Sequence, residues 1–66
     1  MQIFVNGKAK EISEGIIVKT FIDTLRLNSK AIAVELNLKV VPKKEYDTKR
    51  LKEGDKIEII SFVGGG

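Results

Sequence analysis

The spacing of apolar residues at the start of the chain predicts a β-hairpin. The first residues alternate, with Ile3 and Val5 on one face, and Asn6 and Gly7 follow directly. Asparagine and glycine both tolerate the positive φ angles of a tight two-residue turn, so this pair favours a hairpin. The return segment, 8–13, carries mostly charged and polar residues, which is typical of an edge strand that must not pair with other chains.

The next apolar residues recur at intervals of three and four, which predicts a helix lying on a sheet. They are Val18, Phe21, Ile22 and Leu25. Ile17, at the expected N-cap, offers no side-chain acceptor to the first free backbone N–H groups of this helix. Asn28 is expected to close the helix, because asparagine tolerates the left-handed conformation that often ends one.

Strand-like alternation returns in the second half of the chain. Residues 31–36 alternate and predict a strand with one well-buried face. Asn37 and Leu38 are expected to turn the chain. Residues 39–41 then pair back until Pro42 stops the strand, since proline cannot donate a ladder hydrogen bond.

A charged connection leads from there to the last strand. Residues 43–55 are expected to insert Tyr46 and Leu51 into the edge of the core and to end in a turn around Gly54. The final strand is predicted over 56–62, with alternate residues on opposite faces.

This order of elements predicts an α+β domain of the β-grasp, or ubiquitin-like, type. It would be a mixed four- to five-stranded sheet with one helix packed across one face. We assign residues 1–63 to this domain and residues 64–66 to a flexible C-terminal glycine tail.

Side chains alternate between the two faces of a strand, and three apolar residues stand at positions expected to face away from the helix: Phe4, Ile60 and Phe62. In a β-grasp domain the first and last strands are neighbours, so these side chains are expected to form one exposed patch. Scattered surface apolar residues are normal on any monomer, but a contiguous patch marks an interaction surface. We therefore predict that the three residues form a partner-docking surface.

Composition narrows the chemistry. The 66 residues include no cysteine and no histidine, which excludes disulfides, thiolate zinc sites and the commonest general base. We expect no catalytic residue, no metal site and no enzyme activity. The net charge is +3, but acidic residues interrupt the basic ones between 43 and 56, which favours a solvated loop over a nucleic-acid patch. No apolar run could cross a membrane and no signal-peptide pattern is present, so we expect a cytoplasmic protein.

Three glycines follow the last apolar residue, Val63. Without Cβ atoms, Gly64, Gly65 and Gly66 can pass where side chains would clash, and three extended residues span about 10 Å. A frayed end or a linker remnant is the alternative for such a run. We expect Gly64 and Gly65 to thread into a narrow cleft of a partner and to present the carboxylate of Gly66 there.

A set of motifs extends in a fixed order over the whole chain. It comprises Asn6, Gly15, the apolar stripe of 18–25, segments 33–37 and 40–43, Leu51, segment 54–57, Gly65 and Gly66. Together they resemble the ThiS family of sulfur carriers in thiamine biosynthesis. Two residues depart from the family pattern, since Leu38 stands where a turn glycine is common and Ile17 replaces a polar helix cap.

The resemblance implies a carrier cycle. An E1-like adenylyltransferase, ThiF, would use ATP to adenylate Gly66, sulfur would replace AMP to give a thiocarboxylate, and thiazole synthase, ThiG, would receive the sulfur. The carrier would bind no cofactor itself, would contact neither nucleic acid nor membrane, and would be a monomer when free. A terminal carboxyl group with a pKa of about 3.3–3.7 is ionised at neutral pH, so this chemistry needs no side-chain nucleophile.

Other functions are compatible with the same residues. A terminal Gly-Gly also belongs to MoaD-type molybdopterin sulfur carriers and to ubiquitin-like protein modifiers, which share the activation step. A nucleic-acid-binding module that uses the lysines of residues 43–56 is a third alternative, in which the terminal glycines would have no role.

Overall fold

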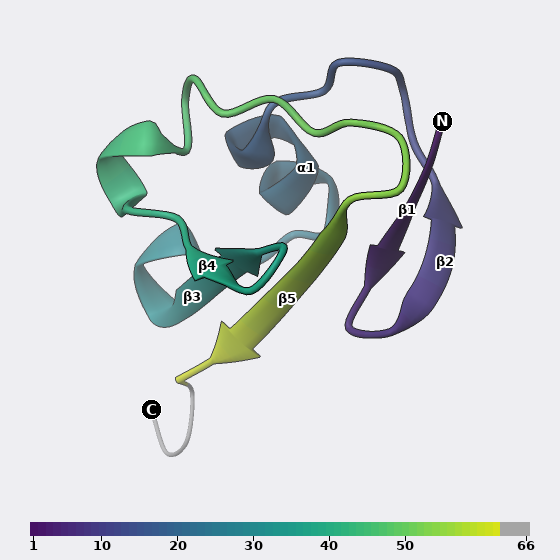
Figure 1. Cartoon of the computed structure of the whole chain (residues 1–66). Coiled ribbons are helices and arrows are strands. Elements are labelled where there is room, and N and C mark those ends of the chain that lie inside the picture. The colour runs from purple at the N-terminus through teal and green to yellow at the C-terminus, as the bar shows by residue number, and fades with distance from the viewer. Residues whose placement is uncertain (63–66) are drawn as a thin grey trace.

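The last strand, β5, lies in the middle of a five-stranded mixed sheet (Figure 1). The computed structural model describes residues 1–62. In chain order its strands are β1 (Gln2–Val5), β2 (Lys8–Glu11), β3 (Ile32–Leu36), β4 (Lys39–Val40) and β5 (Lys56–Ser61). The order across the sheet is β2-β1-β5-β3-β4, with β1 and β5 parallel and the other neighbours antiparallel. The helix α1 (Val18–Thr24) packs across one face, which confirms the predicted α+β arrangement.

Two tight turns form the two hairpins. Asn6 (φ 49°) and Gly7 (φ 86°) join β1 to β2, as predicted. Asn37 (φ 52°) and Leu38 (φ 72°) join β3 to β4 in the same way. Positive φ at both turn positions matches the twist of the flanking strands. Each turn begins with asparagine, one of the few residues besides glycine that adopt this conformation readily.

Helix α1 begins without a side-chain cap, as the sequence around Ile17 predicts. Its first N–H groups donate instead to the connection between β4 and β5. The N–H of Val18 bonds to the carbonyl oxygen of Lys49 at 2.8 Å, and that of Lys19 bonds to the carbonyl oxygen of Tyr46 at 2.9 Å. Backbone acceptors therefore take the place of the missing cap.

The end of the helix differs from the prediction. Asn28 has a φ of −83°, and Arg26 adopts the left-handed conformation instead, with a φ of 59°. Asn28 begins a short 3-10 helix, η1 (Ser29–Ala31), where its side-chain oxygen accepts a hydrogen bond from the N–H of Lys30 at 2.9 Å. The prediction was wrong because the apolar stripe continues to Leu25, which lies past the last helical residue.

The core lies between α1, the inner face of the sheet and the connection from β4 to β5. Its buried residues are Ile3, Val18, Phe21, Ile22, Ile32, Val34, Leu36, Val41, Tyr46, Leu51 and Ile57. The connection begins with a second 3-10 helix, η2 (Lys43–Glu45), and then inserts Tyr46 and Leu51 as predicted. Burial raises the pKa of the Tyr46 hydroxyl, and a hydrogen bond with the backbone of Val34 partly opposes that shift.

Replacing Leu38 with glycine is expected to stabilise the protein. Leu38 has a φ of 72° and is 88% exposed, so it strains the turn and buries almost nothing. Left-handed backbone costs an ordinary residue about 1–2 kcal/mol, and glycine loses about 0.5–1 kcal/mol of extra entropy on folding. Leu38→Gly should therefore raise the free energy of unfolding, measured by chemical denaturation, by up to about 1 kcal/mol.

The matched control is Lys39→Gly in the adjoining strand β4, where the backbone has no positive φ. It should lower the free energy of unfolding by about 0.5–1 kcal/mol. A loss of stability in both variants would contradict the strain assigned to Leu38.

Candidate functional site

The candidate site is the end of β5, because this strand leads toward the predicted glycine tail. β3 pairs with β5 from Ile57 to Ser61. β1 pairs with β5 only at Lys56 and Ile57. Within the described residues, the edge of β5 that faces β1 therefore loses its neighbouring strand beyond Ile57.

A polar network fixes the start of β5. Asp55 is only 6% exposed, and its carboxylate accepts hydrogen bonds from the N–H of Lys52 at 2.7 Å and from Nδ2 of Asn37 at 3.0 Å. The Oδ1 of Asn37 accepts from the N–H of Lys56 at 3.0 Å, and the N–H of Asn37 donates to the carbonyl oxygen of Lys56 at 2.8 Å. The sequence predicts both turns, but it does not reveal that they bond to each other.

Asn6 contacts the middle of β5 from the other edge. Its N–H donates to the carbonyl oxygen of Ile57 at 2.9 Å. Its Oδ1 accepts from the N–H of Ile59 at 2.8 Å, and its Nδ2 donates to the carbonyl oxygen of Ile59 at 3.4 Å. Sequence reasoning used Asn6 only as a turn residue and missed these contacts. The sequence signal for them was the carboxamide of Asn6, which carries both a hydrogen-bond donor and an acceptor and can therefore bond to a strand as a peptide group does.

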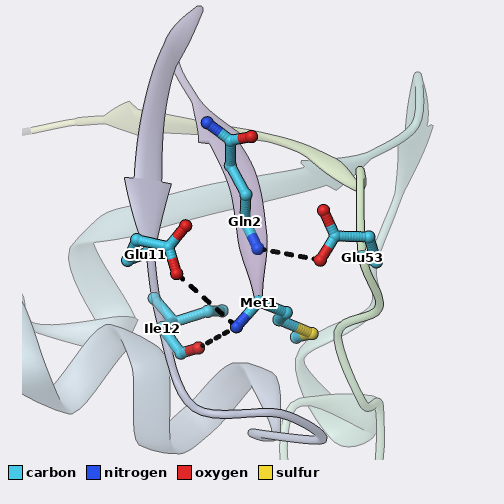
Figure 2. A network of polar contacts seen from close by, with 5 residues as sticks. All are labelled: Met1, Gln2, Glu11, Ile12 and Glu53. Atoms are coloured by element: carbon cyan, nitrogen blue, oxygen red, sulfur yellow. Dashed lines mark hydrogen bonds and ion pairs between the residues drawn. The ribbon is translucent and has the colours of Figure 1, made fainter.

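The start of β1 is held by contacts of its own (Figure 2). The α-amino group of Met1 donates to the carbonyl oxygen of Ile12 at 2.8 Å and lies 3.7 Å from Oε1 of Glu11. The N–H of Gln2 donates to Oε1 of Glu53 at 3.0 Å. These bonds join β1 both to the end of β2 and to the turn before β5, so the position of β1 beside β5 is fixed.

Two of the predicted docking residues, Ile60 and Phe62, lie together at the end of β5. Ile60 is 50% exposed and Phe62 is 59% exposed. The N–H of Phe62 donates to the carbonyl oxygen of Ala31, the residue just before β3, at 2.8 Å. The backbone is therefore hydrogen-bonded up to the last described residue. The predicted tail residues lie outside the described residues; they are Gly64, Gly65 and Gly66.

Phe4 lies apart from this pair on the same open face. It is in register with Lys56, whereas Ile60 is in register with Ala33 of β3. Ile60 comes four positions after Lys56, which is about 13 Å along a strand, with Glu58 between them. The expected contiguous patch of three residues is therefore not formed. The alternation of side chains along the strands correctly predicts that they share one face. It does not predict how far apart they lie along the strands.

A surface hollow lies beside Met1, at the other end of the sheet from Ile60. It is lined by Met1, Glu14, Gly15 and residues 48–53, so charges of both signs surround it. Among residues 1–62, no group of three or more Asp, Glu, His or Cys side chains is placed to hold a metal ion. No helix in that part of the chain is long and apolar enough to cross a membrane.

Comparisons with known proteins agree on one family. The model of the ThiS family matches residues 3–66. A thiazole synthase of Paramagnetospirillum magneticum is 38% identical over 66 residues, covering 100% of this chain and 20% of that protein, so the chain spans a fifth of its length. A sulfur carrier protein ThiS of Bacillus subtilis is 35% identical over 49 residues, 74% of each chain.

The crystal structure of a thiamine biosynthesis protein (ThiS) from Geobacter metallireducens is similar over 100% of both chains. Its TM-score is 0.87 and its sequence is 32% identical. This likeness confirms the predicted β-grasp fold.

Removing the carboxylate of Asp55 should destabilise the protein. In Asp55→Ala the N–H of Lys52 and the Nδ2 of Asn37 lose their acceptor in a buried place, which costs about 1–3 kcal/mol. Asp47→Ala removes an exposed carboxylate from the same connection and should change the free energy of unfolding by less than about 0.5 kcal/mol. Equal losses in chemical denaturation would show that the Asp55 network does not hold the start of β5.

Proposed function

This chain belongs to the ThiS family, and from that membership we propose that it is a sulfur carrier of thiamine biosynthesis. The observation that carries the proposal is the likeness to a ThiS crystal structure over the whole of both chains. The small β-grasp domain serves as a carrier and has no catalytic residue of its own. Its reactive group is the carboxyl group of Gly66.

The proposed reaction begins with the ionised carboxylate of Gly66. One carboxylate oxygen attacks the α-phosphorus of ATP, pyrophosphate leaves, and the acyl-adenylate makes the carboxyl carbon electrophilic. Hydrosulfide, HS⁻, then adds to that carbon, and AMP leaves with the electron pair of the broken C–O bond, which gives the thiocarboxylate and releases one proton. The carrier supplies only this carboxyl group, and the reaction needs no side-chain proton donor or nucleophile from the carrier.

Two partners follow from this chemistry. An E1-like adenylyltransferase, ThiF, provides the ATP site, and thiazole synthase, ThiG, accepts the sulfur. The relative named thiazole synthase supports the second partner, because a segment similar to this whole chain makes up 20% of that protein. The free carrier is a monomer in the cytoplasm, where ATP is available.

Intact-mass measurement of the protein from its native cell tests the proposal. The expected species carries sulfur in place of one oxygen at Gly66, and adding purified thiazole synthase with its substrates returns the carboxylate. Isopeptide-linked conjugates to lysines of other proteins would instead make the chain a modifier. A thiocarboxylate that thiazole synthase cannot use, but that a molybdopterin synthase can, would make it a MoaD-type carrier.

Shortening the tail should abolish adenylation and leave the fold intact. Deleting Gly66 withdraws the carboxylate by roughly 3.5 Å, while reacting atoms must come within about 3–3.5 Å of each other. Pyrophosphate release by the adenylyltransferase should fall at least about a hundredfold. The free energy of unfolding should change by less than about 0.5 kcal/mol, because a terminal glycine has no side chain that could pack in the core.

Gly65→Val is the control for length. It keeps the number of residues in the tail but adds a β-branched side chain, which restricts the backbone and adds bulk at a position where glycine has no side chain. Pyrophosphate release should fail here too. Normal turnover by the deletion variant would end the carrier hypothesis, and a large loss of stability would assign the tail a structural role.

The exposed residues at the end of β5 should bind the adenylyltransferase. Ile60→Ala and Phe62→Ala should each weaken binding by about 1–3 kcal/mol, as truncated apolar anchors do. Val40→Ala is the matched control, since Val40 is also exposed, at 68%, but lies on the far edge strand β4. Calorimetric titration measures the three affinities, with Phe4→Ala testing whether the surface extends to that residue. If Ile60→Ala and Phe62→Ala bind as tightly as Val40→Ala, the docking surface lies elsewhere.

A further inference from the structure

Two glutamates lie opposite each other on the open face of the sheet, the face that α1 does not cover. Glu35 of β3 is in register with Glu58 of β5. Their neighbours along the strands, Val34 and Ile57, are buried in the core, so both glutamates point to the other face. Directly opposed residues of antiparallel strands have Cβ atoms about 4.5–5.5 Å apart. The two acidic side chains therefore leave the sheet from neighbouring points.

Within the described part of the chain, neither carboxylate has a cation beside it. The ion pairs of residues 1–62 join Met1 to Glu11 and Lys19 to Asp23. Like charges directly opposite each other on a sheet are destabilising. The pair Glu35 and Glu58 therefore lowers the stability of the free domain, and no contact within residues 1–62 compensates for it.

The strands separate their charges between the two faces of the sheet. Directly opposed residues share a face, so the strand lysines that stand opposite residues of the core side point toward the helix; they are Lys8, Lys10 and Lys39. On the open face of residues 1–62, Lys56 is the one basic strand residue, beside three acidic ones: Glu11, Glu35 and Glu58. The open face is thus acidic although the whole chain has a net charge of +3, so it complements a basic surface.

Apolar residues continue this surface toward the end of β5. The next pair along the two strands is Ala33 and Ile60, which are also in register. Ile60 is half exposed, and it is one of the residues proposed to bind the adenylyltransferase. A side chain that reaches the two carboxylates from that enzyme can therefore lay its aliphatic part on Ile60.

An arginine side chain fits this arrangement better than a lysine does. A guanidinium group presents five N–H donors in a planar fork, so it can donate to two carboxylates at once. The ammonium group of lysine is a compact charge that holds its water more strongly. Arginine also carries an aliphatic stem that can pack on an apolar neighbour while its charged end is hydrogen-bonded.

We propose that Glu35 and Glu58 form the polar centre of the surface that binds the adenylyltransferase, and that they receive one arginine of that enzyme between them. The inference rests on the proposed sulfur-carrier function, but it concerns recognition of the enzyme and not the chemistry at Gly66. Binding replaces the repulsion between the two carboxylates with charge-assisted hydrogen bonds. The pair that destabilises the free carrier thus selects its partner.

The experiment compares Glu35→Gln and Glu58→Gln with Asp47→Asn. Each variant removes one negative charge and keeps the size of the side chain, and Asp47 is exposed in the connection between β4 and β5. In calorimetric titration against the adenylyltransferase, Kd should rise at least about tenfold for each glutamine variant, as expected for a lost hydrogen bond between charged groups. It should rise less than about twofold for Asp47→Asn. Glutamine variants that bind as tightly as Asp47→Asn would overturn the inference.

Urea unfolding of the free carrier separates recognition from a structural role. Removing one of two opposed like charges should raise the urea midpoint of Glu35→Gln and Glu58→Gln by about 0.2–0.5 M. A side chain that supports the fold would lower the midpoint when it is changed. Lower midpoints in both variants would overturn the inference, because weaker binding would then follow from a damaged fold.

Double-mutant cycles with the exposed arginines of the adenylyltransferase identify the partner residue. Once the contacting arginine is replaced by glutamine, Glu58→Gln should raise Kd by less than about twofold further. Coupling of Glu58 to a lysine, or to no basic residue, would overturn the inference.

The proposed function can be judged apart from this inference. Glutamine variants that bind normally, in a carrier whose Gly66 is adenylated, would overturn the inference and leave the proposed function standing. A wild-type carrier that the adenylyltransferase neither binds nor adenylates would overturn both.

Discussion

The backbone of β5 must be satisfied on both of its edges while the strand leads out of the domain. The edges of a central strand do not face water, so water cannot pair with their N–H and C=O groups. A buried backbone group without a hydrogen-bond partner costs free energy. β3 meets this requirement on one edge along nearly the whole strand, but β1 meets it only at the beginning. The side chains of two turn asparagines supply what the strands do not.

The first N–H groups of helix α1 also find their partners in residues that are distant in the sequence. Ile17 cannot cap α1, and the carbonyl oxygens of Lys49 and Tyr46 accept the first two N–H bonds instead. The connection between β4 and β5 therefore has two roles, since it also places Tyr46 and Leu51 in the core. Its many charged residues lie on the outside of a segment whose backbone and apolar side chains are committed to the fold.

Periodic and local features of the sequence were sufficient for most of the fold. The alternation in β1 and β3, the apolar stripe of α1 and the Asn6-Gly7 turn depend on neighbouring residues, and the structure confirms all of them. The end of α1 was missed at Asn28 because the apolar stripe runs to Leu25, one residue past the helix, and Arg26 is not a residue type expected to adopt left-handed backbone. The alternation of side chains placed Phe4 and Ile60 on one face, but the register of β1 against β5 decides their separation, and register is a property of two distant segments.

The polar contacts of the site were not predictable for the same reason. Asn6, Asn37 and Asp55 each look like ordinary turn residues in their own segments. Apart from the local bond between Asp55 and the N–H of Lys52, their side-chain bonds join residues that are 18 to 53 positions apart in the chain. Only the folded arrangement shows that these turns meet β5.

The central position of β5 also bears on how the protein is made. The β1–β2 and β3–β4 hairpins consist of contacts between near neighbours in the chain. In the sheet of residues 1–62 they join each other only through β5, which is synthesised after the other four strands. Local contacts form early, whereas pairings between distant segments must wait for both partners. The sheet therefore cannot be completed while a ribosome still holds residues 56–61. A chain whose synthesis stops early lacks the strand that unites the two halves, so it presents to the cell an unfinished sheet that proteases can remove.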